Sequence, residues 1–384
     1  MVGAGQLARM THQAAIALGQ SVRLLADSAD DGAAMVASDV RVGDYRSLPD
    51  LQAFAEGCDV VTFDHEHVPG EHIRALAAAG VTVLPGADAL HFAQDKAAMR
   101  ARLDSLGIPA PAWRDLSVEA DPGAALASFG AQVGWPLVVK AITGGYDGKG
   151  VWVLDSLAEA EELLASGTAL LAEAKADIDF EVAALVARSP FGQGAAWPVV
   201  ETVQRDGICT EVIAPAPRLD PETAEIATKL ALRIADELGV VGVLAVELFV
   251  ERSGRLLVNE LAMRPHNSGH WTIEGARTSQ FEQHLRAVLD YPMGVTAQTA
   301  PVVVMANVLG GPDDTAPALD ERVHHLMARW PDVKIHLYGK GFRPGRKVGH
   351  VTALGDDLAL VRSRARAAAD YLSFGDRAEV DAHE

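Results

Sequence analysis

The sequence from 244 to 261 reads LAVELFVERSGRLLVNEL and holds two apolar runs separated by a polar turn. Runs of this length, rich in Val, Leu and Phe and flanking a Ser-Gly pair, predict a β-hairpin. If Ser253-Gly254 forms a two-residue loop, Glu247 pairs directly with Glu260 on one face of the sheet. The hairpin then brings two carboxylates together, with their Cβ atoms about 4.5–5.5 Å apart.

Two opposed carboxylates repel each other unless a cation lies between them. Mg²⁺ meets this requirement, because it takes oxygen ligands and is commonly held by one or two carboxylates together with substrate phosphates. We therefore predict that Glu247 and Glu260 bind Mg²⁺. In the alternative, the register differs by one residue and one of the two side chains faces solvent.

The hairpin runs directly into a polar segment, 259–272, with the sequence NELAMRPHNSGHWT. It holds an acid, a base, two imidazoles, amides and hydroxyls. A buried core strand would not carry these groups, because each unpaired buried polar group costs about 1–3 kcal/mol. The segment therefore indicates a functional site.

A glycine-rich stretch, TGGYDGKG at 143–150, lies between two apolar runs at 136–140 and 151–154 that predict strands. A glycine-rich loop between strands can fold its amides over phosphates, and Lys140 and Lys149 add positive charge. The spacing differs from a Walker P-loop, which requires four residues between its glycines and a helix afterwards. The alternative is a flexible hairpin tip without a ligand.

These motifs resemble those of ATP-grasp enzymes and, more narrowly, those of the N5-carboxyaminoimidazole ribonucleotide synthetase family of purine biosynthesis. The resemblance covers almost the whole chain and rests on four blocks: residues 3–10, 144–150, 259–272 and 344–350. It implies that ATP phosphorylates bicarbonate to carboxyphosphate and that the amine of 5-aminoimidazole ribonucleotide captures the CO2 released from it. Positioning and charge stabilisation then dominate the catalysis.

The resemblance also implies roles for individual residues. Glu247 and Glu260 would hold Mg²⁺. The ATP-binding residues would be Lys96, Lys140, Gly145, Tyr146, Asp147, Gly148, Lys149, Gly150, Glu173, Ala174, Lys175, Ala176, Glu181, Gln204 and Asn259. Within this set, residues 173–176 would form the hinge that pairs with adenine through its backbone, and Glu181 would bind the ribose.

For the other substrates, the residues facing bicarbonate and the aminoimidazole would be Arg264, His266, Asn267, Ser268 and His270. The residues binding the ribotide would be Gln6, Leu7, Glu66, Tyr146, Asp147, Lys340, Arg346 and Lys347. The sequence departs from the family pattern at Met263, at Thr202 and in the run 64–67. Met263 stands where relatives often have Pro, and this exchange removes no chemical group. Thr202 stands where Asn is common, so the polar contact expected from that Asn is in doubt.

The chain of 384 residues is long for one core, so we expect several domains. We predict a Rossmann-like α/β domain at 1–86, an ATP-grasp domain of α+β character at 87–298 and a small C-terminal domain at 299–384. The first should hold strands at 22–25, 60–63 and 81–84 and helices at 11–17 and 70–79. The second should add helices at 155–166 and 220–237, and the third a strand at 302–307 and a helix at 358–371.

The composition excludes several classes of protein. A net charge of −19 argues against a nucleic-acid binder, which needs a basic patch, although local cations can still hold an anionic substrate. A single disulfide between the two cysteines would not hold together a chain of this size. The two cysteines therefore indicate free thiols in a reducing compartment. We find no secretory signal or membrane span and expect a cytoplasmic enzyme, which the family implies to be a homodimer. Most of the first expected strand is missing before Gly3, so we expect the true start to lie upstream.

Four alternatives remain open. The pattern Gly3-x-Gly5-x-x-Ala8 fits a dinucleotide fingerprint and would indicate an NAD-linked oxidoreductase. His266 and His270 have the spacing of a helical zinc site, although Pro265 argues against a helix there. The chain could also be a nucleotide sensor without turnover, or an ATP-grasp ligase acting on a different acceptor. The block at 344–350 favours the ribotide as acceptor.

Overall fold

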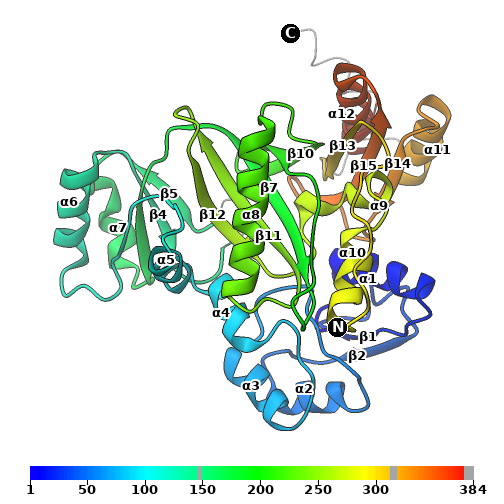
Figure 1. Ribbon diagram of the computed structural model, residues 1–384, viewed down its shortest axis with the longest axis horizontal. Coiled ribbons are helices and arrows are strands. Elements are labelled where there is room, and N and C mark those ends of the chain that lie inside the picture. The colour runs from blue at the N-terminus through cyan, green and yellow to red at the C-terminus, as the bar shows by residue number, and fades with distance from the viewer. Residues whose placement is uncertain (146–148, 312–317, 376–384) are drawn as a thin grey trace.

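The computed structural model of the protein describes residues 1–145, 149–311 and 318–375 (Figure 1). Within these ranges the strands form a two-stranded, a four-stranded and a nine-stranded sheet. In Figure 1 the small four-stranded sheet lies at the left, the large sheet at the centre and the C-terminal elements at the upper right. The N-terminal elements lie below the large sheet. No helix in the described residues is long and apolar enough to cross a membrane.

The N-terminal part is a parallel α/β unit, as predicted. Val2 bridges in parallel to both Leu25 and Phe63, and Val61 bridges in parallel to Val83, so the strands expected at 60–63 and 81–84 pair only through single bridges. The elements are α1 (Gln6–Ala17), β1 (Arg23–Ala26), β2 (Asp39–Val42), α2 (Leu48–Ala55), α3 (Gly70–Ala78) and α4 (Ala87–Gln94). One strand, β2, and two helices, α2 and α4, were not predicted.

The glycines before α1 make room for a side chain of the protein itself. A Cβ on Gly3, which has φ +100°, would lie 1.6 Å from Asp64 Oδ1, and a Cβ on Gly5 would lie 3.1 Å from Asp64 Oδ2. Asp64 Oδ2 accepts the Gly5 N–H at 2.8 Å, so this carboxylate caps α1. A dinucleotide pyrophosphate would meet a carboxylate here, which argues against the NAD-linked alternative.

The four-stranded sheet belongs to a small lobe with the strand order β3-β6-β4-β5. The helix expected at 155–166 is shorter than predicted and begins as a 3-10 turn at Leu157. The Glu159 carboxylate accepts the Asp155 N–H at 3.1 Å. The elements are α5 (Lys96–Ser105), β3 (Trp113–Asp115), α6 (Pro122–Val133), β4 (Leu137–Ala141), β5 (Val151–Leu154), η1 (Leu157–Ala160), α7 (Glu161–Ala165) and β6 (Leu170–Ala174).

The large sheet carries α8, the long amphipathic helix predicted at 220–237, on one face. Asp220 caps α8 by accepting the Thr223 N–H at 2.9 Å, and the helix covers β7 and β11 (Figure 1). The elements of this part are β7 (Ile178–Arg188), β8 (Gly194–Ala196), β9 (Val200–Arg205), β10 (Ile208–Ala214), α8 (Pro221–Glu237), β11 (Gly242–Glu251), β12 (Leu256–Ala262), η2 (Asn267–Gly269), α9 (Thr272–Gly275) and α10 (Gln280–Val288).

The C-terminal strands continue the large sheet. β10 pairs antiparallel with β13, with Glu211 opposite Ala306, so the order runs β12-β11-β7-β9-β10-β13-β15-β14. The strand and the helix predicted for this part are confirmed. The elements are β13 (Val302–Leu309), α11 (Leu319–Arg329), β14 (Lys334–Leu337), β15 (Lys347–Gly355) and α12 (Leu358–Phe374).

The carboxylate hairpin forms with the predicted pairing but not with the predicted loop. Glu247 pairs with Glu260, as expected. The Glu251 N–H donates to the Arg255 carbonyl at 2.9 Å, so the loop has three residues and ends at Gly254 with φ +82°. The register shifts between Glu247 and Leu248, where Asn259 is the extra residue of a β-bulge in β12. The bulge compensates for the longer loop, and the two-residue loop was therefore wrong.

Asp64 should make stability depend on pH. Burial raises the pKa of Asp64 to about 6, so the folded chain holds a proton that the unfolded chain releases near pH 4. This proton stabilises the folded chain below pH 4. The stabilisation is lost as pH rises to about 6, which changes the free energy of unfolding by about 3 kcal/mol. We expect the free energy of unfolding of the wild type, relative to Asp64→Asn, to fall by about this amount between pH 3 and 7 in urea titrations.

The exposed Asp30 on the same domain provides the control. Asp30→Asn removes one exposed carboxyl group from this domain, and the two variants are compared with the wild type at each pH. A flat difference for Asp64→Asn would show that Asp64 titrates normally.

Candidate active site

Four side chains at the base of the site form a closed ring of polar contacts. Arg100 donates from Nε to Glu173 Oε1 at 2.7 Å, and Glu173 Oε2 lies 2.8 Å from Lys140 Nζ. Lys140 Nζ donates to Asn259 Oδ1 at 3.1 Å. Arg100 closes the ring by donating from Nη2 to the Asn259 carbonyl at 2.8 Å. The ring joins the small lobe to the bulge of β12.

The ring keeps its charges although its carboxylate is buried. Burial alone would raise the pKa of Glu173, but Lys140 and Arg100 beside it hold that pKa below its usual value. Two cations and one carboxylate therefore give the ring one net positive charge, which favours a bound phosphate. Arg100 is fully buried and was not predicted as a site residue.

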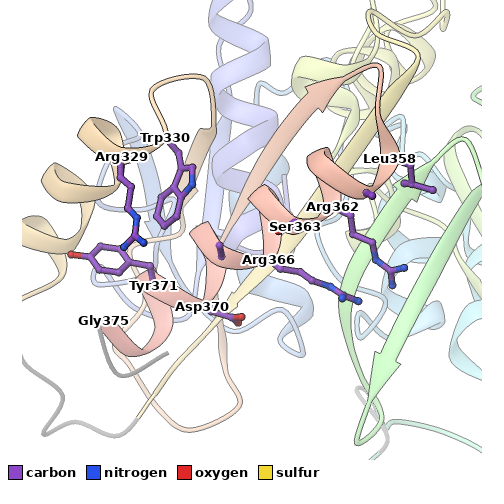
Figure 2. A pocket seen from close by; sticks show the side chains of 11 residues that line it. Arg329, Trp330, Leu358, Arg362, Ser363, Arg366, Asp370, Tyr371 and Gly375 are labelled. Carbon is purple, nitrogen blue, oxygen red and sulfur yellow. The ribbon is translucent and has the colours of Figure 1, made fainter. Parts of the chain in front are cut away.

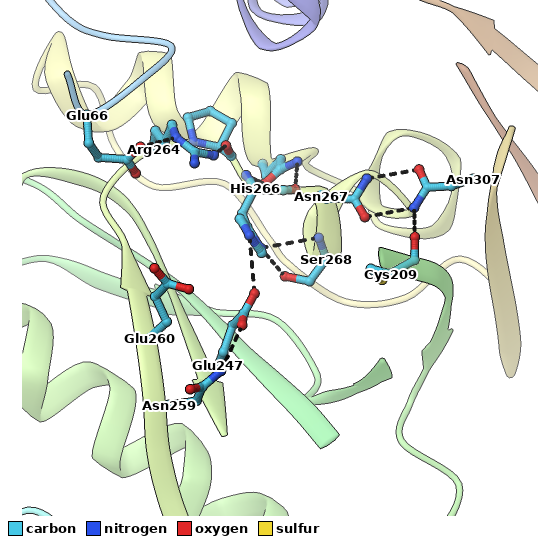
Figure 3. Close-up of polar contacts among 12 residues, drawn as sticks. Glu66, Cys209, Glu247, Asn259, Glu260, Arg264, His266, Asn267, Ser268 and Asn307 are labelled. Atoms are coloured by element: carbon cyan, nitrogen blue, oxygen red, sulfur yellow. Dashed lines mark hydrogen bonds and ion pairs between the residues drawn. The ribbon is translucent and has the colours of Figure 1, made fainter. Parts of the chain in front are cut away.

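The predicted carboxylate pair lies next to this ring, and Figure 3 shows both side chains. Glu247 Oε2 accepts from Asn259 Nδ2 at 3.4 Å, and Glu247 Oε1 lies 3.4 Å from His266 Nε2. Glu260 Oε1 lies 3.6 Å from Lys96 Nζ. Burial and the neighbouring carboxylates raise the pKa of Glu247 to about 8. A bound cation would relieve this repulsion and favour the ionised form of Glu247.

The oxygen ligands of this pair fit Mg²⁺, which commonly takes one or two carboxylates and completes its shell with phosphates and water. Among the residues that the structure describes, no group of three or more His, Cys, Asp or Glu could hold a metal ion. Glu247 and Glu260 therefore suit an ion that arrives with a phosphate-bearing substrate.

The glycine-rich stretch joins β4 to β5, as predicted. Lys96 Nζ donates to the Gly144 carbonyl at 3.1 Å, so the same side chain contacts the base of this loop and Glu260. Gly145 has φ +81°, and a Cβ there would lie 2.5 Å from the Lys149 carbonyl, so the two sides of the loop approach closely. The predicted site residues Tyr146, Asp147 and Gly148 lie outside the described residues.

The predicted ribose and hinge residues lie on neighbouring elements. Glu181 on β7 accepts a hydrogen bond from the Gln204 side chain on β9, and burial raises its pKa. Glu173 and Ala174 end β6, and Lys175 and Ala176 follow it. The side chain of Glu173 belongs to the buried ring. The adenine contact through the backbone of this hinge stays a prediction.

Arg264 links the polar segment to the N-terminal domain. Its Nε donates to Glu66 Oε2 at 2.7 Å (Figure 3). Burial alone would lower the pKa of Arg264, but Glu66 and Asp64 raise it, so the guanidinium stays charged. Among the described residues, Glu66 Oε1 is buried without a hydrogen-bond partner, which leaves one acceptor open to a ligand.

His266 is neutral, with its proton directed toward the carboxylate pair. Burial lowers the pKa of His266 to about 3, with Arg264 and Lys347 adding to the effect. His266 Nδ1 accepts the Ser268 N–H at 3.4 Å and lies 2.9 Å from Ser268 Oγ. A neutral ring that accepts at Nδ1 carries its proton on Nε2, which faces Glu247.

Asn267 forms a reciprocal amide pair with Asn307 of β13. Asn267 Nδ2 donates to Asn307 Oδ1 at 3.0 Å, and Asn307 Nδ2 donates to Asn267 Oδ1 at 2.8 Å. Asn307 also donates to the Cys209 carbonyl at 2.9 Å (Figure 3). The pair therefore fixes the 3-10 turn of the polar segment to the centre of the large sheet.

His270 lies behind the site rather than on its surface. Its side chain is fully buried, and Nδ1 lies 2.9 Å from Gln280 Nε2. Its ring packs against His350 and Phe281, with centroids 5.0 and 5.6 Å away. His266 and His270 thus have separate partners, which argues against a shared zinc ion. A direct contact of His270 with bicarbonate does not fit this burial.

The predicted ribotide cations come from the C-terminal part. Lys340 Nζ contacts Gln6 Oε1 at the start of α1, which brings the two ends of the predicted site together. Arg346 is exposed and donates to the Gly341 carbonyl at 3.3 Å. Lys347 is close enough to lower the pKa of Glu247. Of these residues, Lys340 lies at the helix end that Asp64 caps.

A pocket of about 730 Å³ lies away from these residues, between the end of α11 and the outer face of α12 (Figure 2). Arg362 and Arg366 at its rim both contact Glu211, at 2.8 and 2.6 Å. The lining contains none of the predicted site residues and consists of Arg329, Trp330, Leu358, Ala359, Arg362, Ser363, Arg366, Ala367, Asp370, Tyr371 and Gly375.

The small lobe, the large sheet with opposed carboxylates, the glycine-rich loop and the lysines beside it define an ATP-grasp enzyme. Three family models match the chain in order: the ribonucleotide synthetase preATP-grasp domain at 1–94, the ATP-grasp domain at 101–281 and the phosphoribosylaminoimidazole carboxylase C-terminal domain at 303–364. They confirm the predicted fold class. The boundaries at 86/87 and 298/299 stay a prediction.

Known proteins of this kind match almost end to end. The N5-carboxyaminoimidazole ribonucleotide synthase of Mycobacterium tuberculosis is 59% identical over 379 residues, which is 98% of this chain and 87% of that protein. The Thermus thermophilus synthetase structure is 36% identical, with a TM-score of 0.85 and coverage of 98% and 99%. An Aspergillus clavatus synthase, solved with ADP and 5-aminoimidazole ribonucleotide, is 32% identical, with a TM-score of 0.86 and coverage of 97% and 98%. The chain belongs to the N5-carboxyaminoimidazole ribonucleotide synthase family.

Replacing Arg100 should destabilise the protein strongly. Arg100→Met removes one partner of a fully buried ion pair and leaves two carbonyls of the bulge without their donor. We expect a loss of about 3–5 kcal/mol in the free energy of unfolding, measured by urea denaturation.

Arg102 on the same helix provides the control, because its ion pair with Glu237, at 3.5 Å, is partly exposed. Arg102→Met should cost less than about 1 kcal/mol. Equal losses in the two variants would contradict a structural role for the ring.

Proposed function

We propose that the protein catalyses the ATP-dependent carboxylation of 5-aminoimidazole ribonucleotide with bicarbonate. The product is N5-carboxyaminoimidazole ribonucleotide, with release of ADP and phosphate, a step of de novo purine biosynthesis. The observation that carries the proposal is the contact of Arg264 with Glu66 at 2.7 Å. It joins the segment next to the carboxylate pair to the N-terminal domain, which holds the predicted ribotide residues Gln6, Leu7 and Glu66.

On the ATP side, Lys140, Lys96 and the loop at 145–150 would hold the phosphates. Lys140 is fixed by Glu173 and Asn259, so its charge is placed before ATP binds. Glu181 and Gln204 would bind the ribose. Residues 173–176 would hold adenine through the backbone.

We propose Glu247 and Glu260 as the protein ligands of Mg²⁺, which would neutralise phosphate charge and orient the nucleotide. Asn259 holds Glu247 on one side, and Lys96 lies beside Glu260 on the other. Both carboxylates are therefore oriented by side chains that we assign to the ATP site.

Bicarbonate and carboxyphosphate would lie beside Arg264, His266, Asn267 and Ser268. Arg264 keeps its charge and suits the developing negative charge of the phosphorylated intermediate. The neutral ring of His266 can donate a hydrogen bond without adding charge. We assign His270 a supporting place behind these groups, because it is fully buried.

The ribotide would lie between α1 and β15, close to Glu66. Its phosphate would be held by Lys340, Arg346 and Lys347, of which Lys340 contacts Gln6 at a helix end already capped by Asp64. These side chains, rather than the amides of Gln6 and Leu7, would therefore supply most of the phosphate binding. Tyr146 and Asp147 would contact the ribotide from the loop.

We also propose a cytoplasmic homodimer that acts on small molecules and not on nucleic acid or membranes. Both cysteines, Cys58 and Cys209, lie in the described part of the chain and are free thiols, which suits a reducing compartment. Light scattering on the purified protein would test the dimer: a mass near that of one 40.5 kDa chain would exclude it.

The first experiment measures ADP release with Mg-ATP and bicarbonate, with and without the ribotide. Strong stimulation by the ribotide, together with formation of the carbamate product, is the expected result. ATP binding without stimulation would support the second candidate, an ATP-grasp ligase for a different acceptor. The NAD-linked alternative would require a dinucleotide beside Asp64.

Replacing one carboxylate of the pair should stop turnover and leave the fold intact. Glu260→Gln keeps the size of the side chain but removes the charge that we assign to Mg²⁺. We expect ADP release to fall by at least about 100-fold, because a metal ion supplies several kcal/mol of charge stabilisation. Circular dichroism should remain that of the wild type.

Glu251→Gln on the same hairpin is the control, because the Glu251 carboxylate contacts the turn residues Ser253 and Arg255. It should retain wild-type rates. Full activity in Glu260→Gln would remove this residue from the metal site.

A further inference from the structure

Helix α10 is attached to both halves of the proposed site. Its Phe281 packs in a cluster with Leu7 and Met10 of α1. His284 Nε2 on this helix lies 2.8 Å from Thr62 Oγ1, and His284 Nδ1 accepts the Val243 N–H at 3.2 Å. The helix therefore holds a fixed place between the N-terminal domain and the large sheet.

The first residue of this helix, Gln280, forms hydrogen bonds with the polar segment through its side-chain amide. Gln280 Oε1 accepts the His266 N–H at 2.8 Å, and Gln280 Nε2 donates to the His266 carbonyl at 2.8 Å. Nε2 also lies 2.9 Å from His270 Nδ1. Gln280 is fully buried, so its amide makes these contacts without competition from water.

These contacts determine the state of His270. The amide nitrogen of Gln280 donates hydrogen bonds and does not accept them. His270 Nδ1 is therefore the acceptor, and the ring proton lies on Nε2. The segment also needs a glycine at this point, because a Cβ on Gly269 would lie 2.3 Å from Gln280 Oε1. The backbone and the amide are therefore in close contact from His266 to His270.

A second glutamine on α10 makes the same double contact elsewhere. Gln283 Oε1 accepts the Gly294 N–H at 2.8 Å, and Gln283 Nε2 donates to the Gly294 carbonyl at 3.0 Å. Gln283 is also fully buried. Its target is the segment that leads to β13, where we place no site residue. Gln280 and Gln283 therefore make the same kind of double hydrogen bond, but to two different segments of the chain.

We propose that Gln280 is a positioning residue that sets His266, Asn267 and Ser268 in register with α1, so that ATP cleavage is coupled to carboxylation of the ribotide. The inference rests on the proposed function. Gln280 lies outside the proposed substrate contacts and acts through the backbone of His266. Because α10 also packs on α1, the same helix positions the groups for bicarbonate and those for the ribotide.

The test compares Gln280→Met with Gln283→Met, since methionine keeps the length of the side chain and removes its amide. Gln280→Met should lower kcat/KM for bicarbonate by about 100-fold, the scale expected for a displacement near 1 Å. The dissociation constant for Mg-ATP should change by less than about twofold, because the ring around Lys140 is untouched. ADP formed should exceed ribotide carboxylated.

Gln283→Met should lose a similar amount of thermal stability and keep the wild-type ratio of ADP to carboxylated ribotide. Equal losses of coupling in the two variants, or wild-type kinetics in Gln280→Met, would overturn the proposal. A wild type that releases ADP without carboxylating the ribotide would instead refute the proposed function.

If Gln280→Met fails to fold, Gln280→Glu provides the second variant. Its carboxylate still accepts the His266 N–H but donates to the His266 carbonyl only when protonated. Its activity relative to the wild type should therefore rise as pH falls from 8 to 6. A constant ratio over this range would count against the positioning role.

Discussion

The closed ring of Arg100, Glu173, Lys140 and Asn259 is the contact on which the rest of the site depends. Buried charges are tolerated only when each has partners, and here every member has at least two. The ring holds the bulge in β12, and the bulge restores the register that places Glu260 opposite Glu247. The charge for phosphate and the carboxylates for metal are thus fixed by one set of contacts.

Much of this arrangement could be predicted because it is local in sequence. Apolar runs around a Ser-Gly turn gave the correct pairing of Glu247 with Glu260, and the glycine-rich stretch correctly indicated a loop between two strands. The predicted loop length was wrong, and Glu247 still pairs with Glu260 because Asn259 is an extra residue in β12. Alternation of apolar residues sets which face a side chain occupies, but it does not show where one strand carries an additional residue.

The remaining features depend on contacts between distant parts of the chain. Arg100 lies in a helix with ordinary surface composition, and nothing in its neighbourhood distinguishes it from Arg102 except its partners more than seventy residues away. Asp64 was noted only as part of an unusual run, although its carboxylate fills the space beside the first glycines. His270 belongs to a polar motif, yet its side chain points into the core. Burial of a polar group follows from tertiary packing, which a motif does not encode.

The pairing of β10 with β13 has a practical consequence. Because Glu211 to Ala214 pair with residues 303–306, the C-terminal part of the chain supplies the neighbour of a central strand. A fragment ending before residue 302 would present β10 as a bare edge, open to pairing with other molecules. Truncated or split versions of the chain should therefore keep β13 in the same fragment as β10, its neighbour in the large sheet.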